Sequence, residues 1–399
     1  MALVSVGKLL LFVTAVFCLL KFKKIKPGHL TIKTSYVPAY ILAVLLALSL
    51  SILWTNGSIN ESLNSLGKYG KLLIIAIFIA IIRTQKEAIY ALSSFLVFQT
   101  LLVLSSWSLF FGIAPPWATS NMAITQYSVF SSYLDQGVMG AVTAAVLWHV
   151  RGMAPTPFLR NLMTVMAVAA MSNVLFVLQG RSGHVVAIAL LSLAIMWELP
   201  KRMRLIVVIL PFVLVGLLYL SSDRVSNRLN LVVSEVQSYS GTDPAVTSSG
   251  IRLLLWSRAA RMIASQPLTG YGVGNWNTQF NNDQLSKNPA HNAITSNFNT
   301  HQEYLQWGVQ LGVPGVILFI GLMLVIFRDA IRMSTPISRA TLSVLAAFAI
   351  SCLFNSSLYD AYIGDFFCVA LGILLAAGLE RNKHCRTSPS LTLAPPGAA

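Results

Sequence analysis

Long uninterrupted apolar runs constrain this chain more than any other feature of its sequence. A membrane-spanning helix needs roughly 17–25 mainly apolar residues. We count eleven candidate spans, some of them short, and a twelfth is compatible with the stretch 112–134. The eleven are residues 3–20, 37–54, 70–82, 88–111, 137–150, 161–178, 184–197, 205–220, 312–327, 340–353 and 366–379.

The composition agrees with a membrane protein. Of the residues, 55% are hydrophobic and 10% are charged, whereas a soluble domain carries about 25% charged residues. A transmembrane β-barrel would show segments of about ten residues with strict alternation of apolar and polar residues. The runs here are continuous, so the sequence predicts an all-α polytopic integral membrane protein of 11–12 transmembrane helices.

The basic residues that give the net charge of +15 are concentrated in alternate loops between the predicted spans. Lysines and arginines gather in the loops 21–33, 83–86, 151–160, 201–204 and 328–339 and after residue 380. Such loops face the cytoplasm, so the basic excess does not indicate a nucleic-acid partner. The opposite loops, which face outward, are 55–69, 112–136, 179–183, 221–311 and 355–365.

The predicted organisation follows from these loops. Residues 1–220 form amino-terminal transmembrane helices, 221–311 one large outward loop domain, 312–380 carboxy-terminal transmembrane helices, and 381–399 a disordered cytoplasmic tail. Eleven spans place the amino terminus outside and twelve place it inside. Residues 3–20 are expected to be a retained helix because charge follows the apolar run and no small-residue cleavage pattern is present. The four cysteines form no disulfide framework or metal-type spacing.

The large outward loop contains a predicted amphipathic helix from about residue 251 to residue 265, which carries Arg252 and, one turn later, Trp256. The sequence "QPLTGYGVGNW" ends this helix. Its Gly-x-Gly-x-Gly run is not expected to bind phosphate, because a dinucleotide or P-loop fingerprint needs a preceding strand and a following helix. A tight turn is predicted instead.

Two further outward segments concentrate polar residues. The corner "LQGRSGH" places Arg181 between two glycines, where a phosphate-sized anion can approach the backbone closely. The segment "NFNTHQEYLQWGVQLGVPG" carries His301 just before a span. Arginine binds phosphate oxygens through two parallel hydrogen bonds and stays charged, and histidine accepts a proton near neutral pH. The set fits group transfer from a lipid diphosphate to an alcohol, with fixed cations stabilising the leaving group.

These segments resemble the O-antigen ligase and polymerase superfamily. The motifs that carry the resemblance are "QGRSG", "GIRLLLWSRAARMIASQPLTGYGVGNW" and "THQEYLQWGVQLGVPG", which follow one another in this order along the chain, all on the outward side. The resemblance implies a GT-C-like fold in a bacterial inner membrane, with the active site facing the periplasm. It also implies inverting transfer of a glycan from undecaprenyl diphosphate to a sugar hydroxyl of lipid A–core oligosaccharide, without a metal, nucleotide or other cofactor. The family often has His-Asn where this chain has His301-Gln302.

Matched residue by residue, the resemblance implies that His301 is the general base and that Arg181 and Arg252 hold the diphosphate. Arg258 is a reserve candidate for that role, and Trp256 is expected to pack the loop helix. Further candidates for the lining of the site are His184, Gln302, Tyr304, Asp360 and Trp256 itself. The sequence shows no Asp-x-Asp spacing, so no metal site is predicted.

Two alternatives stay open at this stage. An O-antigen polymerase shares fold and motifs and differs in its acceptor, which is another lipid-linked repeat. A transporter or flippase of lipid-linked sugar belongs to a different class, but transporters tend to carry ionisable residues at mid-membrane depth and inverted repeats. The predicted spans hold few charges and show no repeat, so transfer chemistry at the outer surface is favoured. The expected partners are the lipid-linked donor, the core acceptor and membrane lipids.

Overall fold

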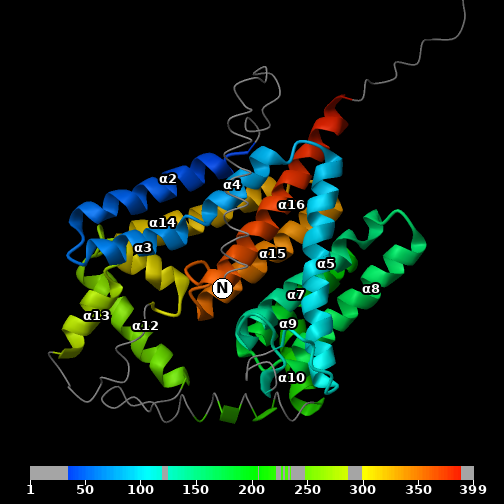
Figure 1. The fold of residues 1–399 in the computed structure, drawn as a ribbon, viewed down its shortest axis with the longest axis horizontal. Helices are drawn as coiled ribbons and strands as arrows, with labels where there is room; N and C mark the ends of the chain where they lie inside the picture. The colour runs from blue at the N-terminus through cyan, green and yellow to red at the C-terminus, as the bar shows by residue number, and fades with distance from the viewer. Residues whose placement is uncertain are drawn as a thin grey trace, which may run out of the picture.

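The computed structural model describes residues 35–118, 125–204, 206–221, 226–227, 230–231, 234, 248–285 and 299–387. Over this part of the chain the protein is all-α, and no strand occurs in it (Figure 1). The helices and helical turns are α2 (Val37–Leu50), η3 (Ser51–Trp54), α3 (Ile59–Tyr69), α4 (Leu72–Ile81), α5 (Gln85–Phe110), α7 (Tyr133–Val150), η4 (Arg151–Met153), α8 (Pro157–Ser172), η5 (Asn173–Val177), α9 (Arg181–Glu198), η6 (Lys201–Met203), α10 (Ile206–Ser221), α12 (Ser248–Ser265), α13 (Trp276–Leu285), α14 (Glu303–Ala330), α15 (Thr335–Phe354) and α16 (Ala361–Thr387).

Ten of the eleven predicted spans coincide with helices of the structure, and the eleventh, residues 3–20, lies outside the described residues. Eight helices in the described residues are long and apolar enough to cross a membrane. They do not include α10, which has 16 residues, or α7, whose ends are polar. Residues 112–118 and 125–132 contain no helix of spanning length, so they do not supply the twelfth span.

Helix α7 lies inside the helical bundle, where it packs against α8, α9 and α15 (Figure 1). It is buried continuously from Gln136 to Leu147, as expected for a helix that is apolar on all sides. Its closest neighbour is α9, because Gly137 faces Gly183: a Cβ atom at Gly183 would lie 2.8 Å from the Cα of Gly137. Small residues permit such close helix contacts in membrane proteins.

Helix α14 begins earlier than the sequence predicted. The predicted span starts at Gly312, whereas the helix starts at Glu303 and bends at Gly312, whose φ of 69° and ψ of −159° are not helical. The polar residues before the bend were assigned to the outward loop. The protein itself buries them: Glu303, Gln306 and Gln310 are each at most 1% exposed. Protein groups supply their hydrogen-bond partners, although Gln310 Oε1 has none among the described residues.

The glycine run after α12 packs against the bend in α14. Gly270 has a φ of 61°, and a Cβ there would lie 2.5 Å from the backbone nitrogen of Gly312. The N–H groups of Tyr271 and Gly272 donate to the carbonyls of residues 309 and 310 at 2.8 and 2.9 Å, and Val313 N–H donates back to the carbonyl of residue 267 at 2.7 Å. The predicted tight turn is confirmed, and its glycines contact protein backbone.

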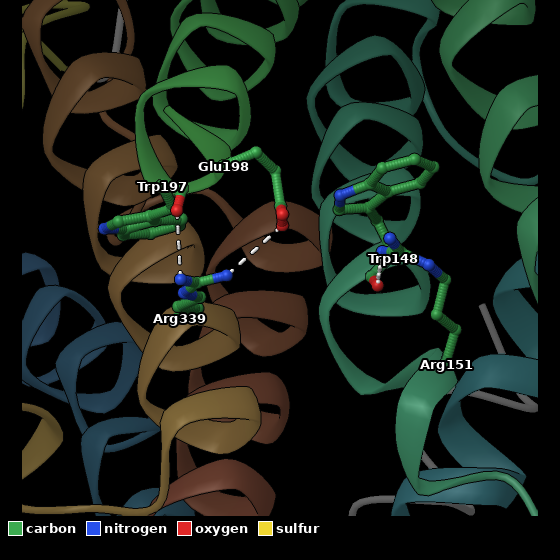
Figure 2. A network of polar contacts seen from close by, with 5 residues as sticks. All are labelled: Trp148, Arg151, Trp197, Glu198 and Arg339. Atoms are coloured by element: carbon green, nitrogen blue, oxygen red, sulfur yellow. Dashed lines mark hydrogen bonds and ion pairs between the residues drawn. The ribbon is translucent and has the colours of Figure 1, made fainter. Parts of the chain in front are cut away.

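The loops group at two ends of the bundle. At one end, Trp54 Nε1 donates to the carbonyl of Thr269 at 3.2 Å, so the end of η3 meets the segment that follows α12. At the other end, the start of α15 meets the end of α9. Arg339 Nη1 lies 3.2 Å from Glu198 Oε1, and its Nη2 donates to the carbonyl of Trp197 at 3.1 Å (Figure 2). We call these the loop end and the basic end.

Three differences from the predicted organisation concern individual segments. The predicted helix at 251–265 is confirmed as α12, which begins three residues earlier, at Ser248. The expected loop 55–69 contains α3, which buries Ser62 and Ser65 against the rest of the protein. Helix α16 continues to Thr387 and so extends beyond residue 380, after which the tail was predicted to begin. Residues 388–399 lie outside the described part.

Candidate active site

His301 occupies the turn that leads into α14. Its backbone φ is +49°, which is uncommon for a residue other than glycine. The Asn299 side chain holds this turn, because its Oδ1 accepts from the His301 N–H at 2.8 Å. Gln302 follows as the N-cap of α14, and its Oε1 accepts from the backbone N–H of Leu305 at 3.2 Å. The sequence around His301 therefore fixes its backbone on both sides.

The surroundings of His301 favour a neutral imidazole. Burial lowers the pKa of His301 from its usual range, and the positive charge of Arg252 lowers it further. A neutral imidazole has a free lone pair at neutral pH, so it can accept a proton. The same electrostatic interaction shows that Arg252 of α12 and His301 lie near one another, although 48 positions separate them in the chain.

The first turn of α12 brings Arg181 to the same region. Arg181 is the first residue of α9, and its Nη1 donates to Ser249 Oγ at 3.0 Å. Ser249 stands three residues before Arg252 and thus on the same side of α12. Arg252 in turn donates through Nη2 to Asn355 Oδ1, at 3.3 Å, where α15 ends. Two guanidinium groups from two helices therefore lie along one turn of α12, and His301 is close to the second.

The glycines beside Arg181 have a different role from the expected one. A Cβ at Gly180 would lie 3.0 Å from the carbonyl oxygen of Tyr133, and Gly183 contacts Gly137. Both glycines therefore face α7 at close range. They set the position of the corner in the bundle, so the proposal that they let an anion approach the backbone is not supported by their placement.

Arg258 lies on another side of α12 than Arg252, and Trp256 lies one turn further along the helix than Arg252. Arg258 comes six positions after Arg252, so its side chain lies about 240° further around the helix axis. Trp256 packs against a hydrophobic cluster that contains Leu255, Trp276 and Val309. Trp256 therefore joins α12 to α13 and α14, as expected from the sequence.

Three other candidates make local contacts. His184 Nδ1 donates to the carbonyl of Gly180 at 2.7 Å, and the ring borders a separate cavity of about 210 Å³ beside the π-helical turn η5. Tyr304 points into the bundle, where its hydroxyl donates to the carbonyl of Ala349 at 3.1 Å. The Gln302 side chain caps α14. The structure thus places Tyr304 and Gln302 in the framework of the site rather than in its lining.

Asp360 lies in the polar network that contains His301. Asn299 connects the two residues, since its Nδ2 donates to Asp360 Oδ1 at 3.2 Å while its Oδ1 accepts from His301. Burial raises the pKa of Asp360 to about 6, and the nearby carboxyl of Asp135 also raises it; Lys71, Lys68 and the Asn299 hydrogen bond oppose the shift. This carboxyl is therefore close to its titration point at neutral pH.

Glu303 fixes the loop that carries Asp360. Its side chain is fully buried, and its Oε2 accepts from the N–H groups of Leu358 and Tyr359 at 3.0 and 3.1 Å. Its Oε1 accepts from Trp307 Nε1 at 3.0 Å. Glu303 therefore ties the start of α14 to the loop between α15 and α16, next to His301.

The sequence alone did not identify the residues that orient the site: Ser249, Asn299, Glu303 and Asn355. Glu303 stood inside the polar cluster and was visible there. Asn299 and Asn355 are residue types that often occur in turns, so their type does not distinguish a site from a loop. Among the described residues, no group of three or more His, Cys, Asp or Glu side chains is arranged to hold a metal ion.

Residues 166–320 match the family model described as O-antigen ligase. This segment contains Arg181, Arg252 and His301, together with the bend at Gly312. This match supports membership of the chain in the O-antigen ligase/polymerase superfamily. No curated protein matches the chain.

The match to the O-antigen ligase family supports a role in O-antigen assembly with lipid-linked glycans as substrates, in a multi-pass membrane protein. The family segment covers α9 to the middle of α14 and includes α12 and the glycine turn that packs on α14. Asn355 and Asp360 lie beyond it, in the loop that Glu303 holds.

Proposed function

We propose that this protein is an O-antigen ligase, an inverting glycosyltransferase that moves O-antigen glycan from undecaprenyl diphosphate to a sugar hydroxyl of lipid A–core oligosaccharide. The observation that carries the proposal is the joint placement of Arg181, Arg252 and His301 around the first turn of α12. Two cations and one neutral base at the loop end supply both halves of a displacement reaction.

The neutral imidazole of His301 takes the proton from the acceptor hydroxyl. The hydroxyl oxygen then forms a bond to the anomeric carbon of the donor glycan, and the bond from that carbon to the diphosphate oxygen breaks. The diphosphate leaves with the electron pair. A single displacement from the opposite face inverts the anomeric centre. The proton then passes from His301 to solvent.

The guanidinium groups of Arg181 and Arg252 act on the leaving group. Negative charge grows on the diphosphate as its bond breaks, and fixed cations lower the barrier by stabilising that charge. Each arginine is oriented by a protein oxygen, Arg181 by Ser249 and Arg252 by Asn355. This orientation limits the reorganisation needed during the reaction. In this mechanism the residues of the chain supply the base and the cations, and no metal ion takes part.

The charge pattern supports a periplasmic location for the site. The loops that carry Arg83, Arg151 and Arg339 alternate along the chain with the loops of the loop end, and loops with such a basic excess face the cytoplasm. We therefore assign the loop end to the periplasmic face of the inner membrane, where the polyprenyl tail of the donor stays in the bilayer while its glycan reaches water.

A reconstituted transfer reaction tests the proposal. Purified protein receives undecaprenyl-diphosphate-linked glycan and lipid A–core, with chelator and without nucleotide. We expect product with the wild type and a loss of at least about a hundredfold in His301→Ala and Arg181→Ala, because removal of a base or of a charge-stabilising group typically costs about this factor. Arg261→Ala is the matched control, since Arg261 lies exposed on the same helix α12. Full activity in both site variants would refute the site.

The acceptor decides between ligase and polymerase. A second reaction replaces lipid A–core with another lipid-linked repeat as the acceptor. Transfer to core alone supports the ligase, and chain growth on the lipid-linked repeat alone assigns the protein to the polymerases. Movement of the lipid-linked donor across proteoliposomes without any transfer would assign it to the transporters.

A further inference from the structure

A second candidate site lies toward the basic end of the bundle, away from His301. A cavity of about 480 Å³ is enclosed by α7, α8 and α9. The space is unfilled because alanines with short side chains line it from all three helices, among them Ala145, Ala167 and Ala194. Ligand-binding cavities commonly have volumes of roughly 300–1,000 Å³. Val168 on the wall is 56% exposed, so the cavity opens to the surroundings of a membrane-spanning helix.

The cavity ends beside a cluster of cations. Trp148 and Glu198 belong to its wall, and each contacts an arginine. The guanidinium of Arg151 lies over the Trp148 ring, 3.5 Å from its centroid, and Arg339 binds Glu198 at 3.2 Å (Figure 2). Both arginines also act electrostatically on His149 of α7. Two guanidinium groups thus meet only one carboxylate in this network, which leaves an excess of positive charge.

Two buried polar atoms of the same network have no hydrogen-bond partner among the residues that the structure describes. They are Trp148 Nε1 and His149 Nε2, and His149 is only 8% exposed. Buried donors and acceptors are normally satisfied, and an unsatisfied one calls for an explanation such as a bound molecule. Figure 2 shows the indole nitrogen of Trp148 turned toward the side of α9 that carries Glu198. A ligand with acceptor oxygens at the mouth of the cavity would satisfy the Trp148 donor.

We propose that this cavity binds one anionic phospholipid of the inner leaflet, with an acyl chain between α7, α8 and α9 and its phosphate at Arg151 and Arg339. The apolar wall fits a hydrocarbon chain, and the cations at its end fit the head group. A free anion would make no contact with the apolar part of the cavity. Basic pockets between transmembrane helices on the cytoplasmic side are places where anionic head groups bind. The inference is independent of the proposed glycan transfer.

Native mass spectrometry of the delipidated full chain in detergent tests this site. The probes are dioleoyl phosphatidylglycerol, which is anionic, and dioleoyl phosphatidylcholine, which is zwitterionic. We expect one bound phosphatidylglycerol with at least about tenfold preference over phosphatidylcholine. The double variant Arg151→Gln/Arg339→Gln should lose about fivefold in affinity for the anionic lipid per arginine removed. Arg328→Gln is the matched control, because Arg328 stacks on Tyr36 and does not line the cavity.

A second variant tests the apolar part of the site. Val168→Trp places a large ring in the opening, where the exposed position of Val168 accommodates it, and should reduce the binding of both lipids at least about tenfold. Ser172→Leu, also on the wall, serves if Val168→Trp does not fold, as judged by its thermal unfolding midpoint. Equal binding of the two lipids, unchanged binding in the filled variants, or a preference for undecaprenyl phosphate over phosphatidylglycerol would overturn the proposal.

Discussion

Asn299 offers the most direct test of how the site is held. Its side chain makes two hydrogen bonds, accepting from the His301 N–H at 2.8 Å and donating to Asp360 Oδ1 at 3.2 Å, and it is 8% exposed. Asn299→Ala removes both. The His301 backbone, with a φ of +49°, then loses the contact that offsets its strain.

The size of the effect follows from these contacts. A left-handed backbone at a residue other than glycine costs about 1–2 kcal/mol. A neutral hydrogen bond contributes about 1 kcal/mol, and one to a charged group about 1.5–3 kcal/mol. Loss of the Asn299 acceptor therefore shifts His301 toward ordinary backbone conformations by an energy comparable to the strain. Since about 1.4 kcal/mol corresponds to tenfold in rate, we expect kcat to fall about tenfold or more.

The assay is single-turnover glycan transfer with saturating donor and acceptor, together with thermal unfolding. Asn299→Asp is the matched variant, because it keeps an oxygen for the His301 N–H and replaces the donor to Asp360 with a carboxyl group. We expect the activity of Asn299→Asp, relative to that of the wild type at the same pH, to fall as the pH rises, because the two carboxyls then no longer share a proton. If Asn299→Ala is folded and has wild-type kcat, the positioning role assigned to Asn299 is refuted.

Three further predictions concern pH and backbone geometry. Since the reaction needs neutral His301, kcat/KM should fall as the pH drops through the lowered pKa of His301. Arg252→Gln removes a positive charge and raises that pKa, so the fall in kcat/KM should move to higher pH. An unchanged pH profile in Arg252→Gln would contradict the interaction between Arg252 and His301. Gly312→Ala should destabilise the protein by about 1–3 kcal/mol in thermal unfolding, because its φ is 69° and a Cβ would collide with the carbonyl oxygen of Pro267. The pKa of Asp360 is raised from 3.8 to about 6, so its stabilising effect is full below pH 3.8 and is lost as the pH rises through 6. Asp360→Asn should remove up to about 3 kcal/mol of this pH dependence, and an identical stability profile for the variant would contradict the shift.

Much of the architecture was predictable because it rests on local patterns. Apolar runs located ten helices now seen in the structure, and the spacing of apolar residues located α12. The choice of Arg181, Arg252 and His301 came from a different kind of argument. Arg181 stood out because cations are disfavoured in outward loops, and the roles of all three residues came from the resemblance of their motifs to the O-antigen ligase and polymerase superfamily. The structure places these three side chains around one turn of α12.

The polar residues of α14 were misassigned for a physical reason. In sequence, Glu303, Gln306 and Gln310 resemble loop residues exposed to water. In the structure their partners come from distant segments, since Glu303 binds the backbone at 358–359 and Gln310 Nε2 donates to the Tyr69 hydroxyl at 3.2 Å. A sequence pattern reports the average environment of a residue type. It does not report which remote group will satisfy a buried carboxylate or amide.

The bend at Gly312 shows how the two halves of the site are held in register. It leaves the carbonyls of residues 309 and 310 available, and the N–H groups of Tyr271 and Gly272 bind them. The segment that follows α12 is thus attached, backbone to backbone, to the helix that follows His301. Hydrogen bonds between backbones do not depend on side-chain identity. The close approach of the two segments does, because a Cβ at Gly270 would collide with the backbone of Gly312 and a Cβ at Gly312 would collide with the backbone of Pro267. The spacing between Arg252 and His301 should therefore tolerate most side-chain changes in the turn and be sensitive to substitution of these two glycines.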